Sequence, residues 1–222
     1  MLYALARAFC LMLFRALWRP VLVGRENIPP TGPVILASNH LSFIDSIVIP
    51  LAVPRPVVFL AKAEYWRGRS PAAWPRRLFF AAFDAVPVQR HQQADAQASL
   101  QLALGILRRG DVFGLYPEGT RSRDGRLYRG RTGVGWLALA SGAPVVPVGL
   151  VGTDRVQPVG ARFPRVHRVR VAFGEPVRPE TYAGLPPGRA RRELTDDVMD
   201  RIAALTGQVR APGYNEHSTD PV

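Results

Sequence analysis

Short apolar runs bounded by glycine, proline or polar residues recur along the chain, and each predicts a strand. The predicted strands are residues 32–39, 55–64, 84–90, 111–119, 143–152 and 165–177. Segments with helical spacing or helix-starting residues separate them. The predicted helices are residues 43–53, 70–83, 93–109, 132–142 and 186–206. Strands that alternate with helices predict an α/β fold with a mixed, largely parallel sheet flanked by helices.

The length of 222 residues suits one main domain. We expect this domain to span residues 20–206, with a helix before it at residues 1–19. The polar segment at residues 207–222 contains prolines and glycines, so we expect a loose tail there.

The first polar cluster follows the apolar run "PVILA" and reads "SNHLSFIDS", residues 38–46. His40 and Asp45 are five residues apart, so they meet only if the chain changes course between them. A strand-to-helix turn would let the Asp45 carboxylate hold one imidazole N–H and leave the other nitrogen as a base. The alternative is structural, because Ser42 and Asp45 also have the spacing of a helix capping box. These nine residues alone leave both interpretations open.

The second polar cluster, "YPEGTRSRDGRL", follows the predicted strand at residues 111–119. Its glutamate, Glu118, could accept a hydrogen bond from a hydroxyl group, while Arg121 and Arg123 could bind a phosphate. Gly119 would allow a tight turn. A charged surface hairpin is the other interpretation. Arg90 also lies at the end of a predicted strand. On its own it is expected to be solvated, and it becomes a candidate binding residue only together with these two clusters.

The net charge is strongly positive, with 29 Lys+Arg against 17 Asp+Glu, which gives +12. Such a chain attracts phosphates, anionic lipids, acidic proteins or nucleic acid. The single cysteine, Cys10, excludes an internal disulfide framework and a multi-cysteine metal site. The histidines other than His40 lack metal-ligand spacing among themselves, so we expect no metal site.

The apolar N-terminal segment, residues 1–20, is interrupted by Arg7 and Arg15. It contains no uninterrupted apolar stretch of the ~18–20 residues that a membrane-spanning helix needs. On a helical wheel, Arg7, Arg15 and Arg19 form a narrow basic stripe on a broad apolar surface. This pattern favours a helix lying in the membrane interface, with its arginines towards anionic head groups. A helix packed on the core is the alternative.

These motifs together resemble the lysophospholipid acyltransferase family, the 1-acylglycerol-3-phosphate acyltransferases that make phosphatidic acid. "NHLSFID" resembles the family's N-H-x(4)-D block, and "YPEGTRS" resembles F-P-E-G-T-R-S with Tyr116 in place of phenylalanine. "FDAVPVQR" and "APVVPVGL" resemble its two remaining blocks, which are less specific. The resemblance covers roughly residues 20–180.

The resemblance implies a role for each matching residue. His40 would be the general base and Asp45 its orienting partner. The substrate-binding residues would be Arg90, Glu118, Gly119, Thr120 and Arg121. The acceptor would be lysophosphatidic acid, and acyl-CoA or acyl carrier protein would be the acyl-donor substrate, with no cofactor. The enzyme would act at the cytoplasmic face of the cell membrane, peripheral or monotopic, on anionic lipid, and no nucleic-acid partner is expected.

Two alternatives stay open at this point. Within the same class, the acceptor could be another lysolipid or glycerol 3-phosphate. From a different class, the chain could be a non-catalytic, basic binder of anionic lipid or nucleic acid. That alternative explains the charge but leaves the two polar clusters at strand ends unexplained.

Overall fold

The computed structural model describes residues 11–62, 86–88, 93–158, 160–161 and 163–216. Within them, a seven-stranded sheet has the order β1-β7-β6-β2-β5-β3-β4. Every neighbouring pair is parallel except β6 and β7, which run antiparallel. The predicted mixed, largely parallel sheet is therefore confirmed. The strands are β1 Val21–Val23, β2 Val34–Ser38, β3 Val57–Lys62, β4 Val86–Val88, β5 Val112–Leu115, β6 Val145–Val151 and β7 Arg170–Phe173.

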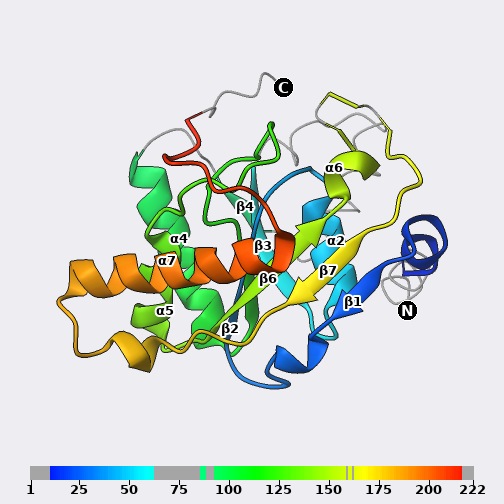
Figure 1. The fold of residues 1–222 in the computed structure, drawn as a ribbon. Helices are drawn as coiled ribbons and strands as arrows, with labels where there is room; N and C mark the ends of the chain where they lie inside the picture. The colour runs from blue at the N-terminus through cyan, green and yellow to red at the C-terminus, as the bar shows by residue number, and fades with distance from the viewer. Residues whose placement is uncertain (1–10, 63–85, 89–92, 159, 162, 217–222) are drawn as a thin grey trace.

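Helices cover both sides of this sheet, with α4, α5 and α7 on one side and α2 on the other (Figure 1). Residues 11–18 are also helical. The predicted helix at residues 70–83 lies outside the described residues. The helices are α2 Asp45–Ala52, α4 Gln93–Arg108, α5 Gly133–Ser141, α6 Thr153–Val156 and α7 Pro187–Thr206, with short 3-10 turns at Arg25–Asn27 and Pro179–Tyr182.

The core consists of two apolar layers, one on each face of the sheet. The central strand β2 shows why, because all five of its residues are buried. Val34 and Leu36 belong to the layer under α2, whereas Ile35 and Ala37 face α4, α5 and α7. Successive side chains of a strand point to opposite faces, so a strand covered on both sides is apolar throughout. This explains the unbroken run "VILA".

One expectation about the second half of the chain differs from the structure. The strand predicted at residues 165–177 is shorter, since β7 comprises only Arg170–Phe173. Before it, the backbone N–H groups of Arg165 and Val169 donate to Val156 and Trp18 instead of continuing the β6 ladder. The short strand β1 and the single-turn helix α6 were not predicted, because three or four residues carry too little periodicity.

The segment after α7 also differs from its expectation over residues 208–216, where a loose tail was predicted. A bridge joins Arg210 to Leu127, and Ala211 and Asn215 are buried. In Figure 1 this segment, drawn in red, runs beside the loop that follows β5. Hydrogen bonds to a neighbouring loop order it despite its polar composition. Residues 217–222 lie outside the described part of the chain.

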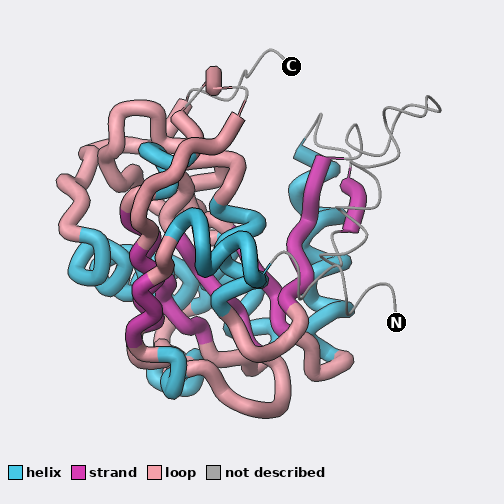
Figure 2. The backbone as a smooth tube through the Cα atoms, turned by 90° about the vertical axis from the view of Figure 1, so that its right-hand side faces the viewer, coloured by secondary structure: helices cyan, strands magenta, loops and turns pink. Residues whose placement is uncertain are grey.

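The parallel strands β2 and β5 are neighbours, so their carboxyl ends lie at the same edge of the sheet. Both polar clusters follow these two ends directly. Figure 2 shows irregular backbone gathering at the end of the molecule where the C-terminus lies. In sheets of this kind, ligands bind at the carboxyl ends of strands, so this edge is the expected place for a ligand.

Candidate active site

The first cluster begins with Asn39, which ties the end of β2 to its neighbour β6. The Asn39 side chain donates from Nδ2 to the carbonyl of Leu150 at 2.9 Å. Its Oδ1 accepts from the backbone N–H of the same residue at 2.8 Å. The amide thus replaces a peptide group in the ladder. The main chain can therefore leave the sheet at His40 without breaking the hydrogen bonding of β6.

The predicted pair His40 and Asp45 is in contact. His40 Nδ1 lies 2.8 Å from Asp45 Oδ2, with the histidine side chain 15% exposed and the aspartate fully buried. An ionised carboxylate only accepts hydrogen bonds, so Nδ1 carries the hydrogen and the neutral ring keeps its lone pair on Nε2. Within the described part of the chain, Nε2 has no hydrogen-bond partner. The ring is thus oriented as a base requires.

The same Asp45 oxygen also organises the turn before α2. Oδ2 accepts the backbone N–H of Leu41 at 2.7 Å and of Ser42 at 2.8 Å. The bond to Ser42 is one half of the capping box that the spacing allowed. The other half differs, because the Ser42 hydroxyl accepts from the N–H of Ile44 at 3.4 Å instead of that of Asp45. α2 begins at Asp45 with Ile44 as its N-cap and no side-chain cap hydrogen bond, so Ser42 is not the N-cap that the capping box requires. The Asp45 carboxylate instead holds the turn before the helix and orients His40.

Glu118 joins the second cluster to the first. It is 1% exposed, and its Oε1 accepts the backbone N–H of His40 at 3.2 Å. Its other oxygen, Oε2, accepts the backbone N–H of Tyr128 at 2.9 Å. In addition, the N–H of Ser122 donates to the carbonyl of His40 at 2.7 Å. The glutamate therefore holds the loop after β5 against the turn that carries the histidine.

Burial raises the pKa of the Glu118 carboxyl from 4.5 to about 7. The two backbone N–H donors oppose this shift by stabilising the charged form. The negative charges of Asp45 and Asp124 add a smaller increase of the pKa. Desolvation prevails because the side chain is almost fully removed from water.

This shift predicts how stability changes with pH. The folded chain binds the Glu118 proton more tightly than the unfolded chain, so the free energy of unfolding falls as pH rises from about 4.5 to about 7. A shift of this size corresponds to a fall of about 3 kcal/mol. In Glu118→Gln this part of the slope should disappear. Denaturant unfolding at pH values across this window would measure it.

Glu193→Gln is the matched control for this prediction, because Glu193 is an exposed glutamate on α7. It should keep the slope of the unchanged chain. The glutamine at position 118 also places an N–H₂ group against a backbone donor, which lowers stability equally at every pH. A slope in Glu118→Gln equal to that of the control would contradict the assignment.

Tyr116, at the end of β5, stacks on the histidine. The rings of Tyr116 and His40 are 3.8 Å apart between centroids, with 7° between their planes. The Tyr116 hydroxyl is 2.9 Å from the Ser46 hydroxyl on α2. The sequence singled out this tyrosine only as a replacement for phenylalanine. Its aromatic character was the available signal, and the structure shows that the ring forms one wall of the site.

The remaining residues of the second cluster lie in the turn after Glu118. Gly119 has a φ of 81°, a left-handed conformation that glycine adopts without strain. A Cβ there would also meet Arg131, at 3.2 Å from Nε. Thr120 and Arg121 follow and are half-buried. The structure thus brings His40, Asp45, Glu118 and Gly119 to one edge of the sheet. Thr120 and Arg121 follow in the same loop, whereas Arg90 lies outside the described residues.

Among the described residues, no three histidine, cysteine, aspartate or glutamate side chains form a group that could hold a metal ion. The expectation of a reaction without metal or cofactor stays a prediction. In the same part of the chain, no helix is both long enough and apolar enough to cross a membrane.

The fold and the site together define an α/β protein with a carboxylate-oriented histidine at the carboxyl edge of its sheet, the arrangement of general-base enzymes. The sequence profile of the acyltransferase family matches residues 19–151, more than half of the chain. The chain belongs to the acyltransferase family.

Two of the relatives match this sequence over most of its length. The chain is 29% identical to a chloroplast 1-acyl-sn-glycerol-3-phosphate acyltransferase of Brassica napus, over 81% of this chain and 48% of that protein. It is also 29% identical to the mouse 1-acyl-sn-glycerol-3-phosphate acyltransferase alpha, over 86% of this chain and 64% of that protein. The chain thus spans about half the length of the first of these relatives.

A solved structure gives the same fold. The crystal structure of the 1-acyl-sn-glycerophosphate acyltransferase PlsC from Thermotoga maritima superposes with a TM-score of 0.69 at 28% sequence identity. The match covers 91% of this chain and 79% of that one. The resemblance inferred from the motifs is therefore confirmed at the level of family and fold.

Proposed function

We propose that this chain transfers a fatty acyl group from an acyl thioester to the free hydroxyl of 1-acylglycerol 3-phosphate, which gives phosphatidic acid. One observation carries the proposal: His40 is oriented by buried Asp45, 2.8 Å away, at the same sheet edge as the Glu118 loop. The family membership and the names of the relatives support the choice of reaction.

The chemistry follows from the orientation of the ring. His40 Nε2 takes the proton of the acceptor hydroxyl as its oxygen attacks the thioester carbonyl. The imidazolium that forms is stabilised by the negative charge of Asp45. The C–S bond then breaks, and the leaving thiolate takes the proton back from the ring. A positioned base of this kind contributes about 10²–10⁴-fold to the rate, and no acyl-enzyme is needed.

The acceptor phosphate would be held at the turn after Glu118, where Arg121 lies, with Arg90 as a further ligand. Glu118 has both oxygens engaged by backbone N–H groups. Its role is therefore to shape the turn that Gly119 and Thr120 form, and a hydroxyl contact through a remaining lone pair is compatible with this. The acyl donor would be acyl-CoA or acyl carrier protein. Both are acidic and suit a chain of net charge +12.

An acceptor panel tests this function. Purified protein is given acyl-CoA or acyl carrier protein and, in turn, 1-acylglycerol 3-phosphate, glycerol 3-phosphate or a lysolipid with a larger head group, and thiol release is followed. Transfer to 1-acylglycerol 3-phosphate should exceed transfer to the others. A preference for another acceptor would replace the proposed substrate. Absence of any transfer would favour the basic, non-catalytic binder.

We also propose that the reaction takes place at a membrane surface, through the helix at residues 11–18. Phe14 is buried and packs on the core, with Leu11 and Trp18 beside it. Leu13 and Leu17 lie one turn apart and are 38% and 40% exposed. The helix thus packs on the core and also presents apolar side chains outward, which combines both alternatives drawn from the sequence. An interface helix places such a face among the lipids.

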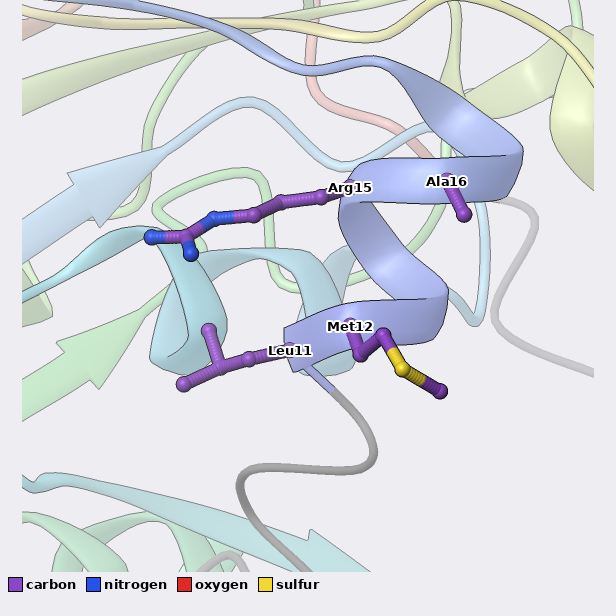
Figure 3. Close-up of a pocket in the computed structure, with 4 residues that line it drawn as sticks. All are labelled: Leu11, Met12, Arg15 and Ala16. Atoms are coloured by element: carbon purple, nitrogen blue, oxygen red, sulfur yellow. The ribbon is translucent and has the colours of Figure 1, made fainter.

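A shallow pocket lies against this helix and is lined by Leu11, Met12, Arg15 and Ala16. Figure 3 shows Leu11 and Arg15 projecting from the same side of the helix. An apolar side chain next to a long basic one suits the boundary between acyl chains and anionic head groups. The cytoplasmic face of the cell membrane is the proposed location.

Vesicle binding tests the membrane contact. Replacing Leu13 and Leu17 by aspartate should weaken binding to vesicles containing phosphatidylglycerol by about tenfold or more, because two apolar side chains are lost from the lipid. Vesicle sedimentation measures this. Leu102→Asp is the control, since Leu102 on α4 is 48% exposed but lies on another element. Equal binding by the double variant and the control would rule out this helix as the contact.

A further inference from the structure

Two arginines in the loop after Glu118 converge on one tyrosine of the C-terminal segment. The guanidinium carbons of Arg129 and Arg131 lie 5.5 and 5.6 Å from the centre of the Tyr214 ring, within the range of cation–π contacts. Both arginines are exposed, and in the described part of the chain neither forms an ion pair with a carboxylate. Two like charges near one ring repel each other, so an anion placed near both would relieve this repulsion.

Arg131 also lies beside the candidate active site. Its Nε and Cδ are 3.2 and 3.3 Å from the position that a Cβ on Gly119 would occupy. Its backbone N–H donates to the carbonyl of Pro117 at 2.8 Å. The intervening Glu118 accepts the N–H of His40. The Nε end of the Arg131 side chain is therefore next to the turn where the acceptor is proposed to bind.

The tyrosine that holds these arginines is itself fixed on both sides. Before it, the Gly213 carbonyl accepts the N–H of Arg129 at 2.9 Å. After it, the buried Asn215 donates from Nδ2 to the carbonyl of Arg121 at 3.1 Å. The segment at residues 208–216 is thus hydrogen-bonded to the same loop that carries the arginines. This gives the Tyr214 ring a defined position.

We propose that Arg131, together with Arg129, binds the phosphate of the acceptor, and that Tyr214 is the positioning residue for both. This inference rests on the proposed function for the identity of the acceptor. Arginine suits the role because its planar group offers paired donors to phosphate oxygens. Stacking on Tyr214 restricts the guanidinium before the ligand arrives, so less freedom is lost on binding. The C-terminal segment is then part of the acceptor site.

Steady-state kinetics with both substrates varied test this site. Arg131→Ala should raise KM for 1-acylglycerol 3-phosphate by about ten- to a hundredfold, as expected for a lost charge-assisted hydrogen bond. KM for the acyl donor and activity on the phosphate-free 1-acylglycerol should not change. Tyr214→Ala should raise the acceptor KM by about two- to fivefold, as expected for an exposed cation–π contact. Tyr214→Phe keeps the ring and should behave like the unchanged chain.

Arg109→Ala is the matched control for charge. Arg109 is an exposed arginine that precedes β5, so it lies at the opposite end of the strand from Glu118. It should leave the acceptor KM unchanged. Arg131→Lys keeps the charge but loses the paired N–H donors of the guanidinium group. Its acceptor KM should lie between that of Arg131→Ala and that of the unchanged chain. A shift in donor KM, or an equal loss on the phosphate-free acceptor, would overturn the assignment.

A binding experiment separates this inference from the proposed function. A short-chain, soluble 1-acylglycerol 3-phosphate is titrated calorimetrically into His40→Ala, with and without Arg131→Ala, and no turnover is needed. Binding that depends on Arg131 supports the phosphate site even if the unchanged chain transfers no acyl group. Binding of the same strength in both variants refutes the site even if acyl transfer is observed.

Discussion

His40→Ala is expected to lower kcat by about 10²–10⁴-fold, the contribution of a positioned general base. The acceptor hydroxyl is a poor nucleophile near neutral pH, and the variant has no group to take its proton. KM for the acceptor should change little, because its phosphate is proposed to bind at other residues. Thiol release at saturating concentrations of both substrates measures the effect.

The control for this variant is His167→Ala. His167 precedes β7, and its Nδ1 contacts the carbonyl of Arg168. It should retain full activity. Activity of His40→Ala equal to that of this control would show that the ring is not the base, and the paired carboxylate would then serve the helix alone.

Asp45→Asn is expected to lower kcat by about tenfold, the difference between a hydrogen bond to a charged group and one to a neutral group. The asparagine can keep its oxygen at the place of Oδ2, where it accepts from His40, Leu41 and Ser42. Its amide nitrogen then takes the place of Oδ1, which has no partner among the described residues. The variant therefore removes the charge that stabilises the imidazolium while the ring stays oriented.

Asp45→Ala should be more severe in both activity and stability. It leaves the backbone N–H groups of Leu41 and Ser42 without an acceptor in a buried turn, at about 1–3 kcal/mol for each. Denaturant unfolding and kcat together distinguish the two variants. If Asp45→Asn loses as much stability as Asp45→Ala, the turn depends on the charge itself, and the activity loss no longer reports on the imidazolium alone.

The elements that the sequence predicted well are those buried on both sides. The runs at β2, β5 and β6 are apolar apart from Ser38 at the end of β2, and all their residues except Leu115 and Val151 are buried. Composition therefore identifies such strands without knowledge of the fold. Edge elements are different, because β1 has three residues and depends on pairing with β7 for its existence. No local pattern reports such a partner.

In the site, too, a local contact could be predicted from the sequence, whereas contacts between distant residues could not. The contact between His40 and Asp45 could be predicted because five residues and one strand-to-helix turn determine it. The acceptor of the Asn39 amide hydrogen is a main-chain carbonyl 111 residues away, and the donors to Glu118 are main-chain N–H groups. Every residue has such groups, so no sequence pattern marks them. Tyr214 and Asn215 were assigned to a loose tail because polar, irregular backbone looks the same whether or not a partner exists.

The C-terminal contacts have a consequence for protein synthesis. The Asn39 side chain bonds Gln208, and Asn215 bonds the loop that follows Glu118. A ribosome makes the chain from the N-terminus, so His40 and Asp45 leave it long before these partners exist. A nascent chain thus carries a complete base but an unfinished acceptor loop. The loop after Glu118 therefore gains its hydrogen bond from Asn215 only after residue 215 has emerged.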